Sequence, residues 1–202
     1  MKLDDRVLPL PLNLHNRTKH CLPPGSSQVQ EILNEIDSYA KEHEMVINTE
    51  KTKVMLFNRS KNTDFMPELR IGDGELLEVV EEFKLLGVII KSDLKWHSNT
   101  IYICRKGFSR LWLLRRLKQI GASEFELLYT YQKQVRSVLE YAVPVWGPGL
   151  NKTDSVEIER VQKCAFAIIF GPETYENILK EQKQQSLQER RINLGYLLPR
   201  RP

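Results

Sequence analysis

The order of apolar and polar positions divides the chain into an irregular lead, a mixed stretch and a helical stretch. Closely spaced prolines remove backbone donors and favour extended neighbours, so residues 1–28 are predicted to be irregular. Apolar residues then recur three and four positions apart, which predicts an amphipathic helix over residues 29–43. Ser27 and Gln30 have the spacing of a capping box, which predicts where this helix begins.

Short apolar runs follow the helix, and their length is typical of strands. One run covers Val54–Phe57, and a longer run over Phe83–Ile90 is interrupted by Gly87. Gly72-Asp73-Gly74 separates two further runs, and an Asp-Gly pair between apolar runs is a strong signal of a β-hairpin. Because these strands do not alternate with helices in βαβ units, the pattern predicts an α+β fold.

The chain becomes helical after Trp96, and three apolar stripes predict a helical bundle. Pro144 is predicted to stop the second stripe and Gly171-Pro172 the third, and a weaker helical pattern starts at Tyr175. The predicted divisions are therefore residues 1–28, 29–97 and 98–202. The three stripes are Ile101, Cys104, Phe108, Leu111, Leu114 and Leu117; then Leu128, Tyr131, Val135, Val138, Leu139 and Ala142; then Ile158, Val161, Ala165, Ile168 and Ile169.

Composition narrows the class of protein. The 202 residues are 41% apolar, which is enough for a core and argues against wholesale disorder. No apolar stretch has the length of a membrane span, so no membrane partner is expected. Three cysteines far apart in the sequence argue against a disulfide framework and favour a reducing compartment, the cytoplasm or the nucleus.

Charge is distributed unevenly along the chain. The net charge of +4 combines an acidic region over residues 29–90 with a basic region over residues 99–136. Such an asymmetry raises the hypothesis of a nucleic-acid partner.

The basic region contains the first candidate site, on the predicted helix after Trp96. Its cations have no acid between Asn99 and Gln119, and Phe108 and Trp112 lie among them. Arginine binds phosphate through two parallel hydrogen bonds and aromatic rings stack on bases, so this face suits nucleic acid. A solvated basic face with core aromatics is the alternative, and the pattern leaves both open. The cations are Arg105, Lys106, Arg110, Arg115, Arg116 and Lys118.

Two further segments could carry chemistry. Lys51 lies in a polar segment between a helix and a strand, where it could donate a proton or bind phosphate, or could belong to an ordinary loop. Asp4 and Asp5 are an adjacent carboxylate pair, which could ligate metal ions or be solvated. The four histidines show no metal-binding spacing, and no Walker loop, dinucleotide loop or nucleophile elbow occurs in the sequence.

Several segments, taken in order, resemble the carboxyl-terminal part of the reverse transcriptase of a non-LTR (LINE-type) retrotransposon. The resemblance covers roughly residues 27–191 and rests on the ordered set rather than on any one segment. The segments are Met45–Phe57 (MVINTEKTKVMLF), Phe83–Val88 (FKLLGV), Asp93–Trp96 (DLKW), Val135–Trp146 (VRSVLEYAVPVW) and Ile158–Lys163 (IERVQK).

The resemblance implies the end of a polymerase palm followed by a helical thumb. It implies that Lys51 lies near the phosphates of the incoming nucleotide and that Phe83, Leu85 and Gly87 belong to the primer grip. The basic helix would then contact the backbone of an RNA template and DNA primer duplex. Asp4 and Asp5 would hold Mg²⁺, although Lys2 and Leu3 depart from the aromatic-x-Asp-Asp pattern of the family.

Two-metal nucleotidyl transfer in this family also needs an upstream aspartate that is not in this sequence. The expectation is therefore a polymerase fragment that is not catalytically competent alone, with a missing amino-terminal half as a possible partner. Two other hypotheses are a non-enzymatic nucleic-acid-binding protein and a helical interaction or structural protein. The last would be unstable, because half a palm exposes sheet edges and apolar surface.

Overall fold

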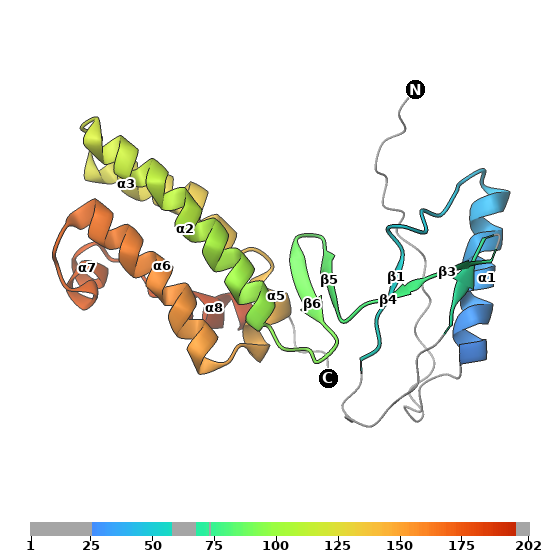
Figure 1. Cartoon of the computed structure of the whole chain (residues 1–202). Helices are drawn as coiled ribbons and strands as arrows, with labels where there is room; N and C mark the ends of the chain where they lie inside the picture. The colour runs from blue at the N-terminus through green and yellow to red at the C-terminus, as the bar shows by residue number, and fades with distance from the viewer. Residues whose placement is uncertain (1–25, 58–67, 73, 197–202) are drawn as a thin grey trace. The chain divides into compact units, whose positions relative to one another are not determined.

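The computed structural model of the chain describes residues 26–57, 68–72 and 74–196 (Figure 1). These residues form two compact units, one from residues 26–52, 68–72 and 74–77 and the other from residues 53–57 and 78–196. Helices dominate, and the described strands form three small two-stranded sheets. The predicted α+β class is confirmed at this level.

The first unit contains helix α1 (Ser26–Glu42) and a hairpin of β2 (Arg70–Ile71) and β3 (Glu75–Leu76). Both elements agree with the sequence prediction. Gly72 and Gly74 have φ angles of 60° and 93°, the left-handed region that glycine tolerates without strain.

Gln30 has a role that its spacing did not predict. Its side-chain amide accepts a hydrogen bond from the Arg70 N–H at 2.9 Å and donates one to the Arg70 carbonyl at 2.6 Å. The side chain therefore pairs with β2 as a neighbouring strand would, and helix α1 contacts that strand. The side chain of Ser27, the other half of the predicted capping box, lies outside the described residues, so the capping box stays a prediction.

The second unit begins with a short parallel pair of β1 (Lys53–Val54) and β4 (Glu78–Val79). The Nζ of Lys53 lies 2.6 Å from a carboxylate oxygen of Glu78 across the pair. The strand predicted over Val54–Phe57 is thus much shorter, and Leu56 and Phe57 are exposed.

The predicted strand over Phe83–Ile90 is instead a hairpin of β5 (Glu82–Leu85) and β6 (Val88–Lys91). Leu86 and Gly87 form its two-residue turn, with φ angles of 46° and 85°. Positive φ at both central positions is the geometry that joins antiparallel strands tightly. Gly87 therefore marks a reversal of the chain rather than a break in one strand.

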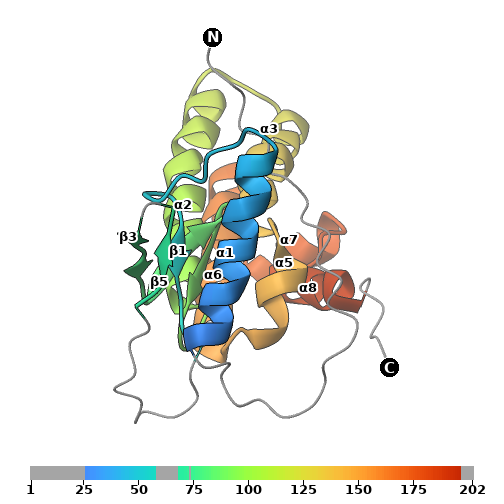
Figure 2. The same ribbon diagram turned by 90° about the vertical axis from the view of Figure 1, so that its right-hand side faces the viewer.

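The helices of the second unit pack around one core. Long helices α2 and α6 lie against each other, and α8 lies beside α5 (Figure 1 and Figure 2). Apolar side chains from several of these helices, such as Leu111, Leu127 and Phe166, fill the core, and Val88 of the hairpin joins them. The helices are α2 (His97–Gln119), α3 (Glu124–Thr130), α4 (Ser137–Leu139), α5 (Val143–Trp146), α6 (Lys152–Phe170), α7 (Tyr175–Glu181) and α8 (Leu187–Tyr196).

The second predicted helix is interrupted. A π-helical segment (Tyr131–Arg136) separates α3 from α4, and Ala142 adopts a left-handed conformation with φ of 54°. The chain then turns, and the Nε1 of Trp146 donates to the Tyr141 carbonyl at 2.8 Å. Pro144 occupies the first turn of α5, where its missing N–H costs nothing, so it begins a helix as well as following one.

A buried carboxylate joins the starts of α2 and α6. Asp154 accepts a hydrogen bond from the side chain of Asn151 at 2.7 Å, and its other oxygen lies 2.7 Å from the Nδ1 of His97. The Asn151 side chain also accepts from the Asp154 N–H at 2.7 Å, which caps α6. Asp154 itself is almost fully buried, so its hydrogen bonds are shielded from water.

We expect Asp154→Ala to lower the free energy of unfolding by about 2 kcal/mol, because it removes the hydrogen bonds through which a buried carboxylate joins the starts of α2 and α6. Urea denaturation followed by circular dichroism measures this. Glu157→Ala is the matched control, since Glu157 is paired with Arg160 at 3.7 Å on the surface. It should change stability by less than about 0.5 kcal/mol. Equal losses for the two variants would contradict the structural role of Asp154.

Candidate nucleic-acid interface

Helix α2 presents an apolar face to the core and a basic, aromatic face to solvent. Ile103, Leu111 and Leu114 point into the core. Arg105, Trp112 and Arg116 are seven and four positions apart, which places them in one row along the opposite face. Trp112 has 62% of its surface exposed, so its ring is available to a partner.

Two of the six predicted cations form hydrogen bonds to the backbone of other elements of the second unit. Arg110 donates to the backbone carbonyl of Gln134 in the π-helical segment. Lys118 donates to the carbonyls of Ile168 and Ile169 in the last turn of α6. The helix dipole also stabilises a cation at this end of a helix. Their exposure leaves some charge at the surface, but their hydrogen bonds hold α2 against its neighbours.

The other four cations lie on the exposed surface of α2. Arg105 and Arg115 extend the basic face, and Arg116 donates to the side chain of Gln119 at 3.3 Å. Lys106 donates to the hydroxyl of Tyr102 at 3.3 Å. We call Arg105, Lys106, Arg115 and Arg116 the basic face of α2.

Phe108 and Trp112, the two aromatic residues that lie among these cations in the sequence, differ in their exposure to solvent. Phe108 is half-buried and packs against the core, as the alternative interpretation predicted for aromatic residues here. Trp112 is exposed, as a stacking role requires.

The β5–β6 hairpin contributes the second part of the site. The hydroxyl of Tyr141 donates to the Leu86 carbonyl at 2.8 Å, which attaches the hairpin turn to the segment after α4. A Cβ atom at Gly87 would make an ordinary contact of 3.4 Å with the Tyr141 ring, so it is the positive φ rather than the space that favours glycine there. Of the other predicted hairpin residues, Phe83 is half-buried and Leu85 is half-exposed.

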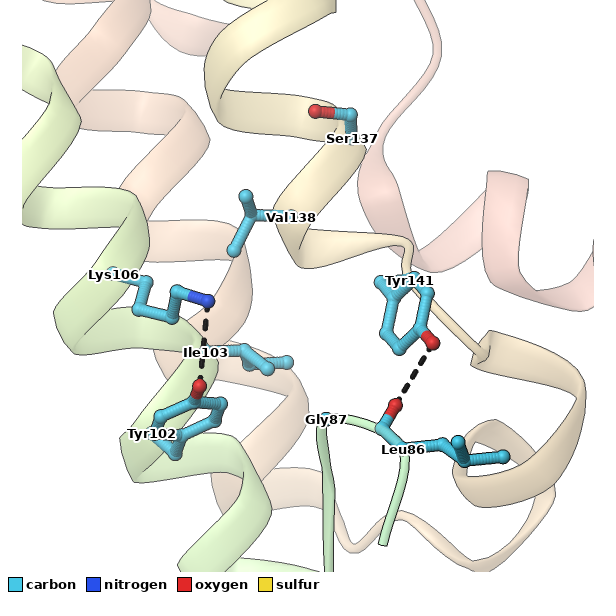
Figure 3. Close-up of a pocket in the computed structure, with 8 residues that line it drawn as sticks. All are labelled: Leu86, Gly87, Tyr102, Ile103, Lys106, Ser137, Val138 and Tyr141. Carbon is cyan, nitrogen blue, oxygen red and sulfur yellow. Dashed lines mark hydrogen bonds between the residues drawn. The ribbon is translucent and has the colours of Figure 1, made fainter. Parts of the chain in front are cut away.

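A pocket of about 260 Å³ separates the hairpin turn from α2 and α4 (Figure 3). Its lining comes from these elements and from Tyr141. The lining residues are Leu86, Gly87, Tyr102, Ile103, Lys106, Ser137, Val138 and Tyr141.

Two lysine side chains approach the ring of Tyr102 at this pocket. The Nζ of Lys84 is 4.5 Å from the ring centroid and that of Lys106 is 5.1 Å from it. Hydrogen bonding by Lys84 first, and by Lys106 second, holds the pKa of the Tyr102 hydroxyl below its ordinary value of 10.0. The local potential is therefore positive.

We expect the double variant Lys84→Ala/Lys106→Ala to raise the pKa of Tyr102 toward its ordinary value, because the phenolate loses both ammonium partners. Titration of ¹³Cζ-labelled tyrosine by NMR measures this. Lys133→Ala is the control, since Lys133 lies 5.6 Å from the centroid of Tyr129 instead. A Tyr102 pKa that is the same in wild type and the double variant would contradict this assignment.

Of the three predicted catalytic residues, the structure describes only Lys51. Lys51 belongs to the first unit, is exposed, and follows a turn in which the Asn48 side chain accepts from the Lys51 N–H at 2.9 Å. Asp4 and Asp5, the predicted Mg²⁺ ligands, lie outside the described residues. Within the described ranges, histidine, cysteine and acidic side chains form no group of three or more that could hold a metal ion.

Sequence reasoning did not single out Lys84, Tyr102 or Tyr141 as site residues. A signal for Tyr102 was present, because it lies four positions before Lys106 and residues at that spacing are neighbours on a helix. Lys84 lies near the pocket because the hairpin reverses at Leu86 and Gly87, and Tyr141 lines it because the chain turns after α4. No local sequence pattern indicates either feature.

Comparison with known protein families, with curated proteins and with solved structures found no match. Of the helices that lie in the described ranges, none combines the length and the apolarity that a bilayer crossing requires.

Proposed function

We propose that this chain is part of the RNA-directed DNA polymerase of a non-LTR (LINE-type) retrotransposon, and that its second unit binds the template–primer duplex. The observation that carries the proposal is the basic face of α2 with the exposed ring of Trp112 in the same row. Cations on one side of a rigid helix can contact successive phosphates, and an exposed indole can stack on a base or a sugar.

The hairpin supports the same proposal. The segment that resembles a primer grip, Phe83–Val88, is the end of a hairpin whose turn is held by Tyr141. A turn that is fixed to the helical bundle can position a strand end relative to the basic face, whereas a free loop cannot. In the proposed protein these two features contact the same duplex.

Nucleotidyl transfer is the activity of the family, and its residues remain predictions for this chain. Mg²⁺ would assist the attacking and leaving oxygens in that reaction. Asp4 and Asp5 are proposed as its ligands and Lys51 as the residue that contacts the triphosphate.

A specific observation also favours a second candidate, a non-enzymatic nucleic-acid-binding protein. The basic face, the hairpin and the pocket all belong to the second unit. The buried core residues that support them, from Val88 to Leu187, belong to the same unit. Duplex binding therefore needs no residue of the first unit. Primer extension on an RNA template with Mg²⁺ distinguishes the two when the missing amino-terminal half is supplied in trans, because only a part of a polymerase would then incorporate nucleotides.

The experiment that tests the proposed binding is the salt dependence of affinity for a DNA–RNA duplex, followed by fluorescence anisotropy. Each phosphate neutralised contributes about 0.9 to the slope of log K against log salt, so four cations predict a slope of about −3 to −4. Binding that is undetectable at low salt, or that does not weaken as salt rises, would contradict the proposal.

A further inference from the structure

The pocket beside the hairpin turn has walls that suit one flat ring system. Ile103 and Val138 supply apolar surface, and the rings of Tyr102 and Tyr141 lie at its sides (Figure 3). Its volume of about 260 Å³ is below the range of roughly 300–1,000 Å³ that is usual for drug-sized ligands. A single base with part of its sugar fits this scale better than a dinucleotide does.

The entrance to the pocket carries positive charge. Lys106 lines the pocket, and the ammonium of Lys84 approaches the same Tyr102 ring from the hairpin. Glu140, the acid next to Tyr141 in the chain, is engaged elsewhere, because Arg190 donates to both of its carboxylate oxygens. The charge of Glu140 is thus neutralised by Arg190. A phosphate group at the entrance would therefore contact two lysines.

The pocket is accessible and its shape is fixed. Tyr141 has 53% of its surface exposed, yet its hydroxyl is held by the Leu86 carbonyl, so its ring cannot swing freely. Tyr102 accepts a hydrogen bond from Lys106 at 3.3 Å, and the ammonium of Lys84 lies 4.5 Å from the centroid of its ring. Rings that are already ordered lose little conformational entropy when a base stacks on them.

We propose that this pocket binds one unpaired nucleotide at the end of a nucleic-acid strand, with the base between Tyr102 and Tyr141 and the phosphate at Lys84 and Lys106. The inference rests on the proposed function and adds a subsite for a base that has left the duplex. A strand end, rather than a free nucleotide, is the occupant because Lys106 belongs both to the pocket and to the basic face of α2.

The test compares a blunt DNA–RNA duplex with the same duplex carrying one unpaired nucleotide, by fluorescence anisotropy. We expect the overhang to bind about tenfold more tightly, the effect of stacking one base. Ser137→Phe should remove this advantage by filling the pocket. Ser137→Ala, which keeps the pocket open, should retain the advantage.

Two outcomes would overturn the pocket assignment. One is equal affinity of the wild type for the blunt and overhanging duplexes, or an advantage that survives in Ser137→Phe. The other is tight binding of free adenosine monophosphate without any overhang advantage, which would assign the pocket to free nucleotides. Absence of salt-sensitive blunt-duplex binding would instead contradict the proposed function, so the two failures are distinguishable.

Discussion

Replacing Gln162 by leucine is expected to lower the free energy of unfolding by at least about 3 kcal/mol, a large part of the usual total of roughly 5–15 kcal/mol. Gln162 has only 1% of its surface exposed and is the centre of a buried polar network. Its amide oxygen accepts from the hydroxyl of Tyr131, and its amide nitrogen donates to the hydroxyl of Tyr175 at 2.7 Å and to the Gln185 carbonyl at 3.0 Å. Leucine fills a similar volume but satisfies none of these groups.

The network extends to the start of α8, which enlarges the expected effect. Tyr175 donates to Glu159, and Glu159 accepts from the N–H groups of Leu187 at 3.0 Å and Gln188 at 3.1 Å. Burial raises the pKa of the Tyr131 hydroxyl well above its ordinary range, so this hydroxyl remains a hydrogen-bond donor near neutral pH.

Urea denaturation of Gln162→Leu measures the loss, with Gln188→Leu as the matched control. The side chain of Gln188 is exposed, and its N–H keeps its bond to Glu159 in the control. The control should change stability by less than about 0.5 kcal/mol. A loss in Gln162→Leu no larger than in the control would show that the network does not hold α6, α7 and α8 together.

The second large effect concerns binding. The triple variant Arg105→Gln/Arg115→Gln/Arg116→Gln should weaken DNA–RNA duplex binding about 10- to 100-fold and reduce the magnitude of the salt slope by about three. These arginines are exposed on α2 and have no ion-pair partner among the described residues. Their removal should therefore leave the folded state intact, and anisotropy at several salt concentrations measures the change.

A charge-matched control separates a specific face from net charge. Lys152→Gln/Arg160→Gln/Lys180→Gln removes the same number of cations from α6 and α7, where all three side chains are exposed. We expect this control to bind within about twofold of the wild type, because only long-range attraction is reduced. Equal weakening of both triple variants would assign binding to net charge and contradict a defined interface.

The sequence predicted elements whose signals are local. Helix α1 follows from its apolar spacing, and the β2–β3 hairpin from its Gly-Asp-Gly turn. Ser123 and Glu126 form a capping box at the start of α3, and their spacing was a usable signal that sequence reasoning did not take. These features depend on residues within a few positions of one another.

Features that depend on distant partners were not predictable. Gln30 has the sequence spacing of a cap but pairs with β2, and Arg110 is one of six similar cations but donates to the carbonyl of Gln134. The left-handed conformation of Ala142 has no sequence signal, since alanine rarely adopts it. Tertiary contacts decide these positions, and the pocket depends on them.

The measurement that tests the central claim most directly is tryptophan fluorescence during titration with a DNA–RNA duplex. Trp112 is exposed in the proposed interface, whereas Trp146 is fully buried and Trp96 packs against the core. We predict that duplex quenches the emission of the wild type and that Trp112→Phe binds without this quenching. Binding that quenches both proteins equally, or neither, would place the duplex elsewhere and contradict the account.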